Sequence, residues 1–262
     1  MFDFIYYGSA KLELFLLLIL RASGLLLFSP VIGHQSIPKT AKVGLAILFA
    51  IVLMPAMQGV EIPVAESPVE LAGMVARELM VGILIGFFFA LLIKAAEAAG
   101  SLVGFQVGLI IAQAFDPNAN DQVAIIGRLW IILATLIFMA INGHHLVILA
   151  FSDSYQVIPA GYMQVDGSTA ELMMKFTGYV FVLALKFAAP VMITLFLTDV
   201  ALGTVAKMMP TMNIFVAGFP IKITVGFAVL AMSLPVFSYV LEKTTVLINN
   251  AAGGLLASMG KV

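Results

Sequence analysis

Cysteine is absent from this chain of 262 residues, and Asp, Glu, Lys and Arg together make up only 10% of it. Without cysteine there can be neither a disulfide nor a thiolate metal site. The formal net charge is −1, which leaves no basic surface of the kind that binds nucleic acid. We therefore expect no nucleic-acid partner.

Motifs of catalysis are also missing. The sequence has no Gly-x-Ser-x-Gly elbow, no phosphate-binding Gly-Lys-Ser/Thr motif and no His-Glu-x-x-His zinc motif. His144 and His145 are adjacent, so on a helix their side chains point in different directions, whereas a catalytic zinc needs about three protein ligands. We expect no catalytic residue, no metal and no cofactor, and we infer that the chain is not an enzyme.

Apolar residues dominate the chain, at 62% of the sequence, and the mean hydropathy is +1.13. A soluble domain is about half apolar and about a quarter charged, so this composition predicts an integral membrane protein. The first apolar run is interrupted by Glu13 and Arg21 and has no small-residue cleavage pattern. It is therefore expected to be a permanent helix and not a cleaved signal peptide.

Seven apolar segments without strand-like alternation predict an all-α fold of helical hairpins. They cover residues 12–32, 43–57, 71–93, 101–115, 123–151, 176–198 and 221–241. The second and fourth are shorter than the roughly 20 residues needed to cross a bilayer. Pro190 and Pro235 lie inside apolar segments, so broken or kinked helices are expected.

Charged residues interrupt these segments at five positions. Each would be unfavourable by about 2.5–3.5 kcal/mol at a lipid-exposed helix centre. We therefore expect them to be buried against protein, except where one lies near a segment end and its charge reaches the membrane interface. Structural ion pairs are the favoured interpretation, and a proton relay or ion pathway is the alternative. The five are Arg21, Arg77, Glu78, Arg128 and Lys186.

Small residues recur every four positions and predict two packing grooves on consecutive helices. Such a stripe lets a neighbouring backbone approach closely. The grooves could be filled within one hairpin or by other subunits, and two consecutive grooves favour other subunits. The first stripe contains Gly82, Gly86 and Ala90, and the second contains Ala96, Gly100, Gly104, Gly108 and Ala112.

The segment Phe105–Asp116, which overlaps the second stripe, combines glycine with bulky apolar residues and ends in Asp116-Pro117. It could leave the helix early as a re-entrant loop, and an apolar constriction there would gate by shape and dewetting. An ordinary short helix in a hairpin is the alternative.

Several short motifs follow one another along nearly the whole chain. They are Arg21-x-x-Gly24 running to Pro30, Ile37-Pro38, Gly100, Gly104-Phe105-Gln106-x-Gly108, Asp116-Pro117, Asn142-Gly143-His144, Pro210-x-x-Asn213 and Gly218-x-Pro220-x-Lys222. In order and spacing they resemble the FliR family, the export-gate subunit of the bacterial flagellar type III secretion apparatus, which has injectisome relatives.

The resemblance implies a multi-subunit export gate in the bacterial inner membrane, in the flagellar basal body, through which unfolded flagellar substrates pass. Residues 1–170 would be a FliP-like region and residues 171–262 a FliQ-like hairpin. The implied partners are FliP-like and FliQ-like subunits, an FlhA/FlhB-like export apparatus, and membrane lipid.

The resemblance also implies a plug loop at about residues 105–117 that seals the channel. Its candidate residues are Phe105, Gln106, Leu109, Ile110, Ile111 and Phe115. Where the family loop is often bulky, this chain has Ala112-Gln113-Ala114. The alternative function is a secondary transporter or channel for a small solute, suggested by the intramembrane charges, although the internal repeat usual in transporters is absent.

Overall fold

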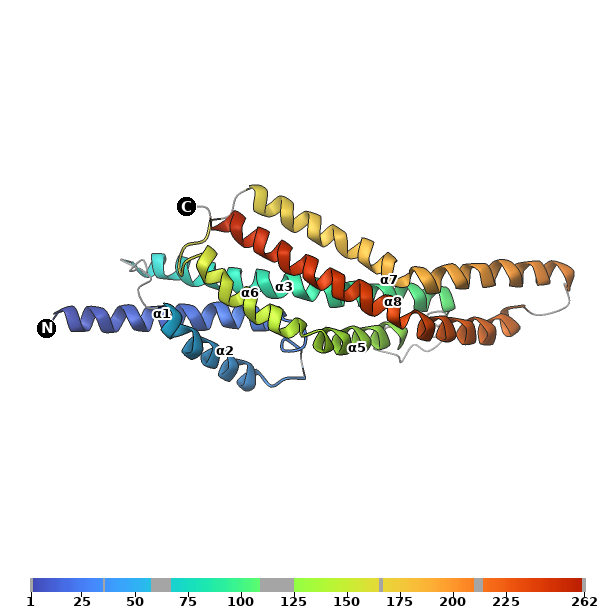
Figure 1. Cartoon of the computed structure of the whole chain (residues 1–262), viewed down its shortest axis with the longest axis horizontal. Coiled ribbons are helices and arrows are strands. Elements are labelled where there is room, and N and C mark those ends of the chain that lie inside the picture. The colour runs from blue at the N-terminus through green and yellow to red at the C-terminus, as the bar shows by residue number, and fades with distance from the viewer. Residues whose placement is uncertain are drawn as a thin grey trace. The chain divides into compact units, whose positions relative to one another are not determined.

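The computed structural model describes residues 2–34, 36–57, 67–108, 125–164, 167–209 and 214–260. These residues form seven α-helices and one short 3₁₀ helix and contain no strand, which confirms the predicted all-α fold (Figure 1). The elements are α1 (Phe2–Phe28), α2 (Lys39–Leu53), η1 (Met54–Met57), α3 (Pro68–Val107), α5 (Ile125–Ala140), α6 (Gly143–Val157), α7 (Gly167–Met208) and α8 (Ile214–Met259).

Helix α3 is a single helix of 40 residues, where the sequence predicted two separate apolar segments. It begins at a well-capped end, because the Ser67 hydroxyl accepts the backbone N–H of Glu70 at 3.2 Å and proline occupies the first helical position. Residues 94–99 contain neither glycine nor proline and are strong helix formers, so the helix continues through the expected break. Lys94 and Glu97 form an ion pair at 2.7 Å there.

Helices α5 and α6 divide a segment that the sequence predicted to be continuous. The two helices are bent by 67° relative to one another. Asn142 lies at this break in the left-handed conformation, with φ 58°. Asparagine tolerates that conformation better than most residues, so the Asn-Gly pair explains the break.

Helices α7 and α8 run through internal prolines, Pro190 in α7 and Pro220 and Pro235 in α8. In each case a hydroxyl three or four residues further on donates to the carbonyl of the proline itself. These bonds are Thr194 to Pro190 at 2.9 Å, Thr224 to Pro220 at 2.8 Å and Ser238 to Pro235 at 2.9 Å.

Three of the described helices are long and apolar enough to cross a membrane: α3, α7 and residues 218–259 of α8. The bent α5–α6 pair would add a fourth if it is one span. In each of these helices we compare an apolar stretch of 18 residues. The chain itself buries 56% of this stretch in α3, but only 33% in α7 and 22% in α8. Most of the apolar surface of α7 and α8 therefore needs lipid or another protein to cover it.

The chain divides into two compact units. The first unit contains Met1–Leu91, Ile141–Phe176 and Thr245–Val262, and the second contains Leu92–Ala140 and Thr177–Thr244. Helices α3, α7 and α8 contribute residues to both. Each unit is a group of residues that contact one another more than they contact the rest of the chain. The predicted boundary between residues 170 and 171 is a different division, between a FliP-like and a FliQ-like part, and it stays a prediction.

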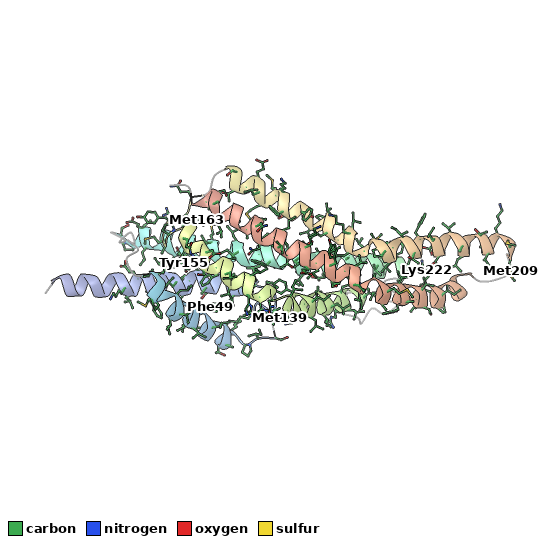
Figure 2. All side chains as sticks on the ribbon, in the orientation of Figure 1. Phe49, Met139, Tyr155, Met163, Met209 and Lys222 are labelled. Carbon is green, nitrogen blue, oxygen red and sulfur yellow. The ribbon has the colours of Figure 1, made fainter. Side chains whose placement is uncertain are left out.

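Aromatic contacts mark the core of each unit. In the first unit the rings of Phe49 and Phe151 lie 5.8 Å apart, and Phe151 also meets Tyr155 at 5.6 Å (Figure 2 labels Phe49 and Tyr155). In the second unit Phe237 lies edge-on to Trp130 at 4.6 Å and to Phe187 at 4.8 Å, which joins α5, α7 and α8. Such edge-to-face pairs add to the stabilisation from burial alone.

Candidate functional site

Arg21 of α1 and Glu78 of α3 form an ion pair that is almost fully buried in the first unit, with side-chain exposures of 0% and 1%. Arg21 Nε donates to Glu78 Oε2 at 2.7 Å, and Arg21 Nη2 donates to Glu78 Oε1 at 2.9 Å. This bidentate geometry is the strongest arrangement available to a guanidinium and a carboxylate. The two helices are thus joined by a charge pair shielded from solvent.

Further contacts satisfy both charges. Arg21 also donates to the Ser154 hydroxyl at 3.0 Å and to the Ile158 carbonyl at 3.1 Å, and its guanidinium lies 3.9 Å from the centre of the Tyr155 ring. The backbone N–H of Gly161 donates to Glu78 Oε1 at 2.8 Å. Because the partners come from α6 and the loop after it, the network supports structural ion pairing over a proton pathway.

The other three charged residues that were predicted to be buried are exposed on the described chain: Arg77, Arg128 and Lys186. The single chain therefore does not bury these three, and their burial against other subunits stays a prediction. Arg77 Nη1 donates to the carbonyl of Gly161 at 3.2 Å, and Lys186 Nζ lies 5.6 Å from the Tyr179 ring. Long cationic side chains can keep the charged group in solvent while the stem packs on apolar surface, so a charge in an apolar segment does not imply burial.

The first glycine groove holds α1 against α3 inside the first unit. A Cβ on Gly82 would lie 2.0 Å from the Arg21 carbonyl oxygen, and one on Gly86 would lie 2.6 Å from the Leu25 carbonyl oxygen. From the other side, a Cβ on Gly24 would lie 2.5 Å from the carbonyl oxygen of Leu79. The two backbones approach more closely than any side chain would allow.

The second groove is filled inside the second unit. A Cβ on Gly100 would lie 2.6 Å from the Cα of Gly127 in α5, and Gly104 is also buried. The expectation that other subunits fill these grooves is therefore wrong for Gly82, Gly86 and Gly100. Single glycines on α1 and α5, which do not form a stripe of their own, provide the matching surfaces.

The end of α3 is defined by Gly108. Its φ is +90°, a conformation that residues with a Cβ rarely adopt, and its N–H donates to the carbonyl of Phe105 at 3.0 Å. A Cβ on Gly108 would lie 2.6 Å from Cε1 of Phe219 in α8. Glycine is therefore needed here both for the backbone turn and for the close approach of an aromatic ring.

Replacing Gly108 with alanine is expected to weaken this end of α3, because both the positive φ and the Phe219 ring oppose a Cβ. The loss should be about 1–3 kcal/mol, the range typical of overpacking and of a strained backbone. Gly203→Ala is the matched control, since a Cβ at Gly203 meets open space. Thermal stability of the purified protein checks the pair, and equal stability of the two variants would contradict the packing at Gly108.

A polar cluster lies beside this end of α3 in the second unit. Gln106 Nε2 donates to Asp199 Oδ2 at 3.2 Å, and Lys222 Nζ lies 2.7 Å from Asp199 Oδ1 (Figure 2 labels Lys222). Three helices, α3, α7 and α8, thus meet at one carboxylate. Gln106 was predicted from sequence as a plug-loop residue, whereas Asp199 was not singled out.

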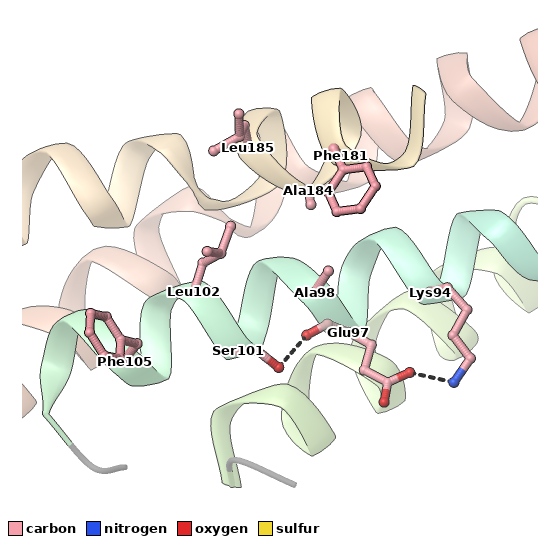
Figure 3. A pocket seen from close by; sticks show the side chains of 9 residues that line it. All are labelled: Lys94, Glu97, Ala98, Ser101, Leu102, Phe105, Phe181, Ala184 and Leu185. Atoms are coloured by element: carbon pink, nitrogen blue, oxygen red, sulfur yellow. Dashed lines mark hydrogen bonds and ion pairs between the residues drawn. The ribbon is translucent and has the colours of Figure 1, made fainter. Parts of the chain in front are cut away.

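Phe105 points away from the core, with 67% of its surface exposed. It lies at one end of an apolar groove of about 670 Å³ between α3 and α7 in the second unit, and Lys94 and Glu97 lie at the other end (Figure 3). The remaining lining residues are Ala98, Ser101, Leu102, Phe181, Ala184 and Leu185. The remaining predicted plug residues, Leu109, Ile110, Ile111 and Phe115, lie outside the described residues.

Groups of acidic residues and histidines that could hold a metal ion were not found within the described ranges. The rings of His144 and His145 lie 4.3 Å apart at the break between α5 and α6. His34 Nδ1 accepts the backbone N–H of Ser36 at 3.2 Å and so has a local role.

Sequence reasoning missed several residues that complete these sites. Ser154, Gly161 and Asp199 supply the partners of residues that it did select, and Phe219 covers Gly108. The visible signal for Asp199 was its position directly after the apolar segment 176–198, because a carboxylate beside an apolar run is rarely left unpaired. No sequence signal marks the other three.

Comparison with known proteins places this chain in a family. A family model described as "Bacterial export proteins, family 1" matches residues 12–247. The chain is 31% identical over 249 residues to the flagellar biosynthetic protein FliR of Bacillus subtilis (strain 168), covering 94% of this chain and 95% of that protein. It is 28% identical to FliR of Escherichia coli (strain K12), covering 87% and 86%. The chain therefore belongs to family 1 of the bacterial export proteins, the FliR family of flagellar export components.

Proposed function

We propose that this chain is a non-enzymatic subunit of the flagellar type III protein export gate, and that it helps to form and seal the channel for unfolded flagellar substrates. The plug would be the segment that follows Gly108, with Leu109, Ile110, Ile111 and Phe115 as its apolar side chains. The observation that carries this proposal is the construction of the α3 end, where a left-handed glycine and a polar cluster fix the point at which that segment begins.

The proposed setting is a complex in the bacterial inner membrane, within the flagellar basal body. FliP-like and FliQ-like subunits and an FlhA/FlhB-like apparatus are the proposed partners. Support comes from α7 and α8, whose apolar residues are largely uncovered in the chain itself; Phe181, for example, is 71% exposed and Met232 78% exposed. Neighbouring subunits and lipid would cover these faces.

The alternative of a small-solute transporter depended on charges inside apolar segments. Arg21 and Glu78 are paired with each other and saturated with hydrogen bonds, so they are poorly suited to exchange protons with a pathway. In the described part of the chain three other charged residues are exposed and do not line a polar path for a solute or a proton: Arg77, Arg128 and Lys186. The export-gate proposal is therefore preferred.

Replacing Ile110, Ile111 and Phe115 together with alanine is expected to make the assembled complex leak ions several-fold faster, because smaller side chains leave a wetted gap in an apolar constriction. Leakage is measured by ion flux in vesicles that contain the purified complex. Leu136→Ala is the control, since Leu136 lies on α5 and is 61% exposed. An unchanged leak in the triple variant would mean that the plug lies elsewhere.

A further inference from the structure

We propose that Gln106, Asp199 and Lys222 form a latch that holds the end of α3 in the sealed state and opens when a substrate passes. Asp199 is the positioning residue of this latch, since its carboxylate contacts both of the others. This inference rests on the proposed gate function and adds a means of control to it.

The position of the latch is the first argument. Gln106 lies two residues before Gly108, where the described part of α3 ends, and Asp199 and Lys222 lie on the two helices of the α7–α8 hairpin. Any change in the distance between the hairpin and α3 must therefore stretch the contacts of Asp199. The latch thus links the hairpin to the start of the proposed plug.

The exposure of the latch is the second argument. On the single chain Asp199 is 39% exposed and Lys222 is 19% exposed, so this chain's own residues do not enclose their contact. An ion pair that the fold leaves partly open is weak, whereas the buried pair of Arg21 and Glu78 cannot separate without leaving a charge unpaired in the interior. The chain therefore has one ionic contact suited to permanent structure and another suited to reversible opening.

The packing around the latch is the third argument. Gly226 of α8 faces Val107 and Leu195, where a Cβ would meet the Val107 side chain at 3.2 Å, and Phe219 covers Gly108. These contacts are apolar and non-directional, so they let the surfaces slide. The directional part of the contact is the Asp199 carboxylate, which fixes where α3 rests on the hairpin.

The first test removes the charge of Asp199. Asp199→Asn keeps an oxygen for Gln106 but loses the ion pair with Lys222, and we expect a several-fold higher ion leak through the assembled complex at an unchanged yield of complex. The reversed pair, Asp199→Lys with Lys222→Asp, restores the attraction and should lower the leak again. A purely structural role would lower the yield of complex, and the reversed pair would restore that yield. That result, like an unchanged leak, would overturn the latch.

The second test asks whether the latch opens. This chain has no cysteine, so Gln106→Cys with Asp199→Cys introduces a single pair, which a short reversible dithiol cross-linker can join in a complex otherwise free of cysteine. Cross-linking should block export, and reduction should restore it. The control pair is Thr169→Cys with Ser258→Cys, whose hydroxyls lie 3.1 Å apart and join α7 to α8 within the first unit. Normal export with the 106–199 pair joined would overturn the latch.

The variants of the proposed plug separate the two proposals. If Ile110→Ala, Ile111→Ala and Phe115→Ala together increase the leak but Asp199→Asn does not, the latch is wrong and the gate stands. If the triple variant fails to leak, the gate proposal itself fails, whatever the behaviour of Asp199.

Discussion

Replacing Glu78 with alanine is expected to reduce the stability of the chain by about 3–5 kcal/mol, because the substitution leaves the guanidinium of Arg21 buried without a counter-charge. It also removes the acceptor of the Gly161 N–H. Most domains are stable by only 5–15 kcal/mol, so we expect a large fall in the yield of folded protein. Yield and thermal stability of the purified complex are the measurements.

Two control variants make this prediction specific. Arg77→Ala changes the neighbouring residue, which is exposed, and should have a much smaller effect. Arg21→Met combined with Glu78→Leu removes both charges and fills the space with apolar groups, so it should be less harmful than either single change. If Glu78→Ala and Arg77→Ala were equally mild, the buried network would not have the role assigned to it.

Gly82→Ala is expected to separate α1 from α3, although alanine is the better helix former. Alanine favours a helix by about 1 kcal/mol over glycine. That gain is smaller than the effect of placing a Cβ 2.0 Å from the carbonyl oxygen of Arg21, since backbone atoms cannot move aside without shifting a helix. Overpacking of this kind destabilises by about 1–3 kcal/mol, and the net effect should be unfavourable.

Gly73→Ala, on the same helix, should have the opposite sign. A Cβ at Gly73 meets nothing within 4 Å, so only the helix propensity changes and stability should rise slightly. Thermal unfolding of the two variants in the same detergent compares them directly. A stabilising Gly82→Ala would show that α1 and α3 do not approach as closely as described.

The sequence was informative about which residues are unusual and less so about what they contact. Arg21 and Glu78 stood out as charges in apolar segments, but they are 57 positions apart, and nothing local identifies one as the partner of the other. Arg77 and Glu78 are adjacent and were treated alike. One residue turns a helix by about 100°, so the first faces outward and the second faces the core.

The glycine stripes show the same limit. Small residues at every fourth position predicted grooves on α3, and grooves are present at Gly82, Gly86 and Gly100. What fills a groove depends on the opposite surface, and there a single glycine is enough, as Gly24 and Gly127 show. Helix length was underestimated because Lys94 and Glu97 interrupt the apolar run, although polar residues that favour helix do not end one; these two form an ion pair on α3.

The native mass of the purified protein tests most directly the claim that other export subunits cover the open apolar faces of α7 and α8. When the chain is produced together with FliP-like and FliQ-like subunits, we expect a uniform complex heavier than the 27.9 kDa chain by whole partner subunits, and aggregation when it is produced alone. A stable, uniform particle of 27.9 kDa, without partners, would contradict the account.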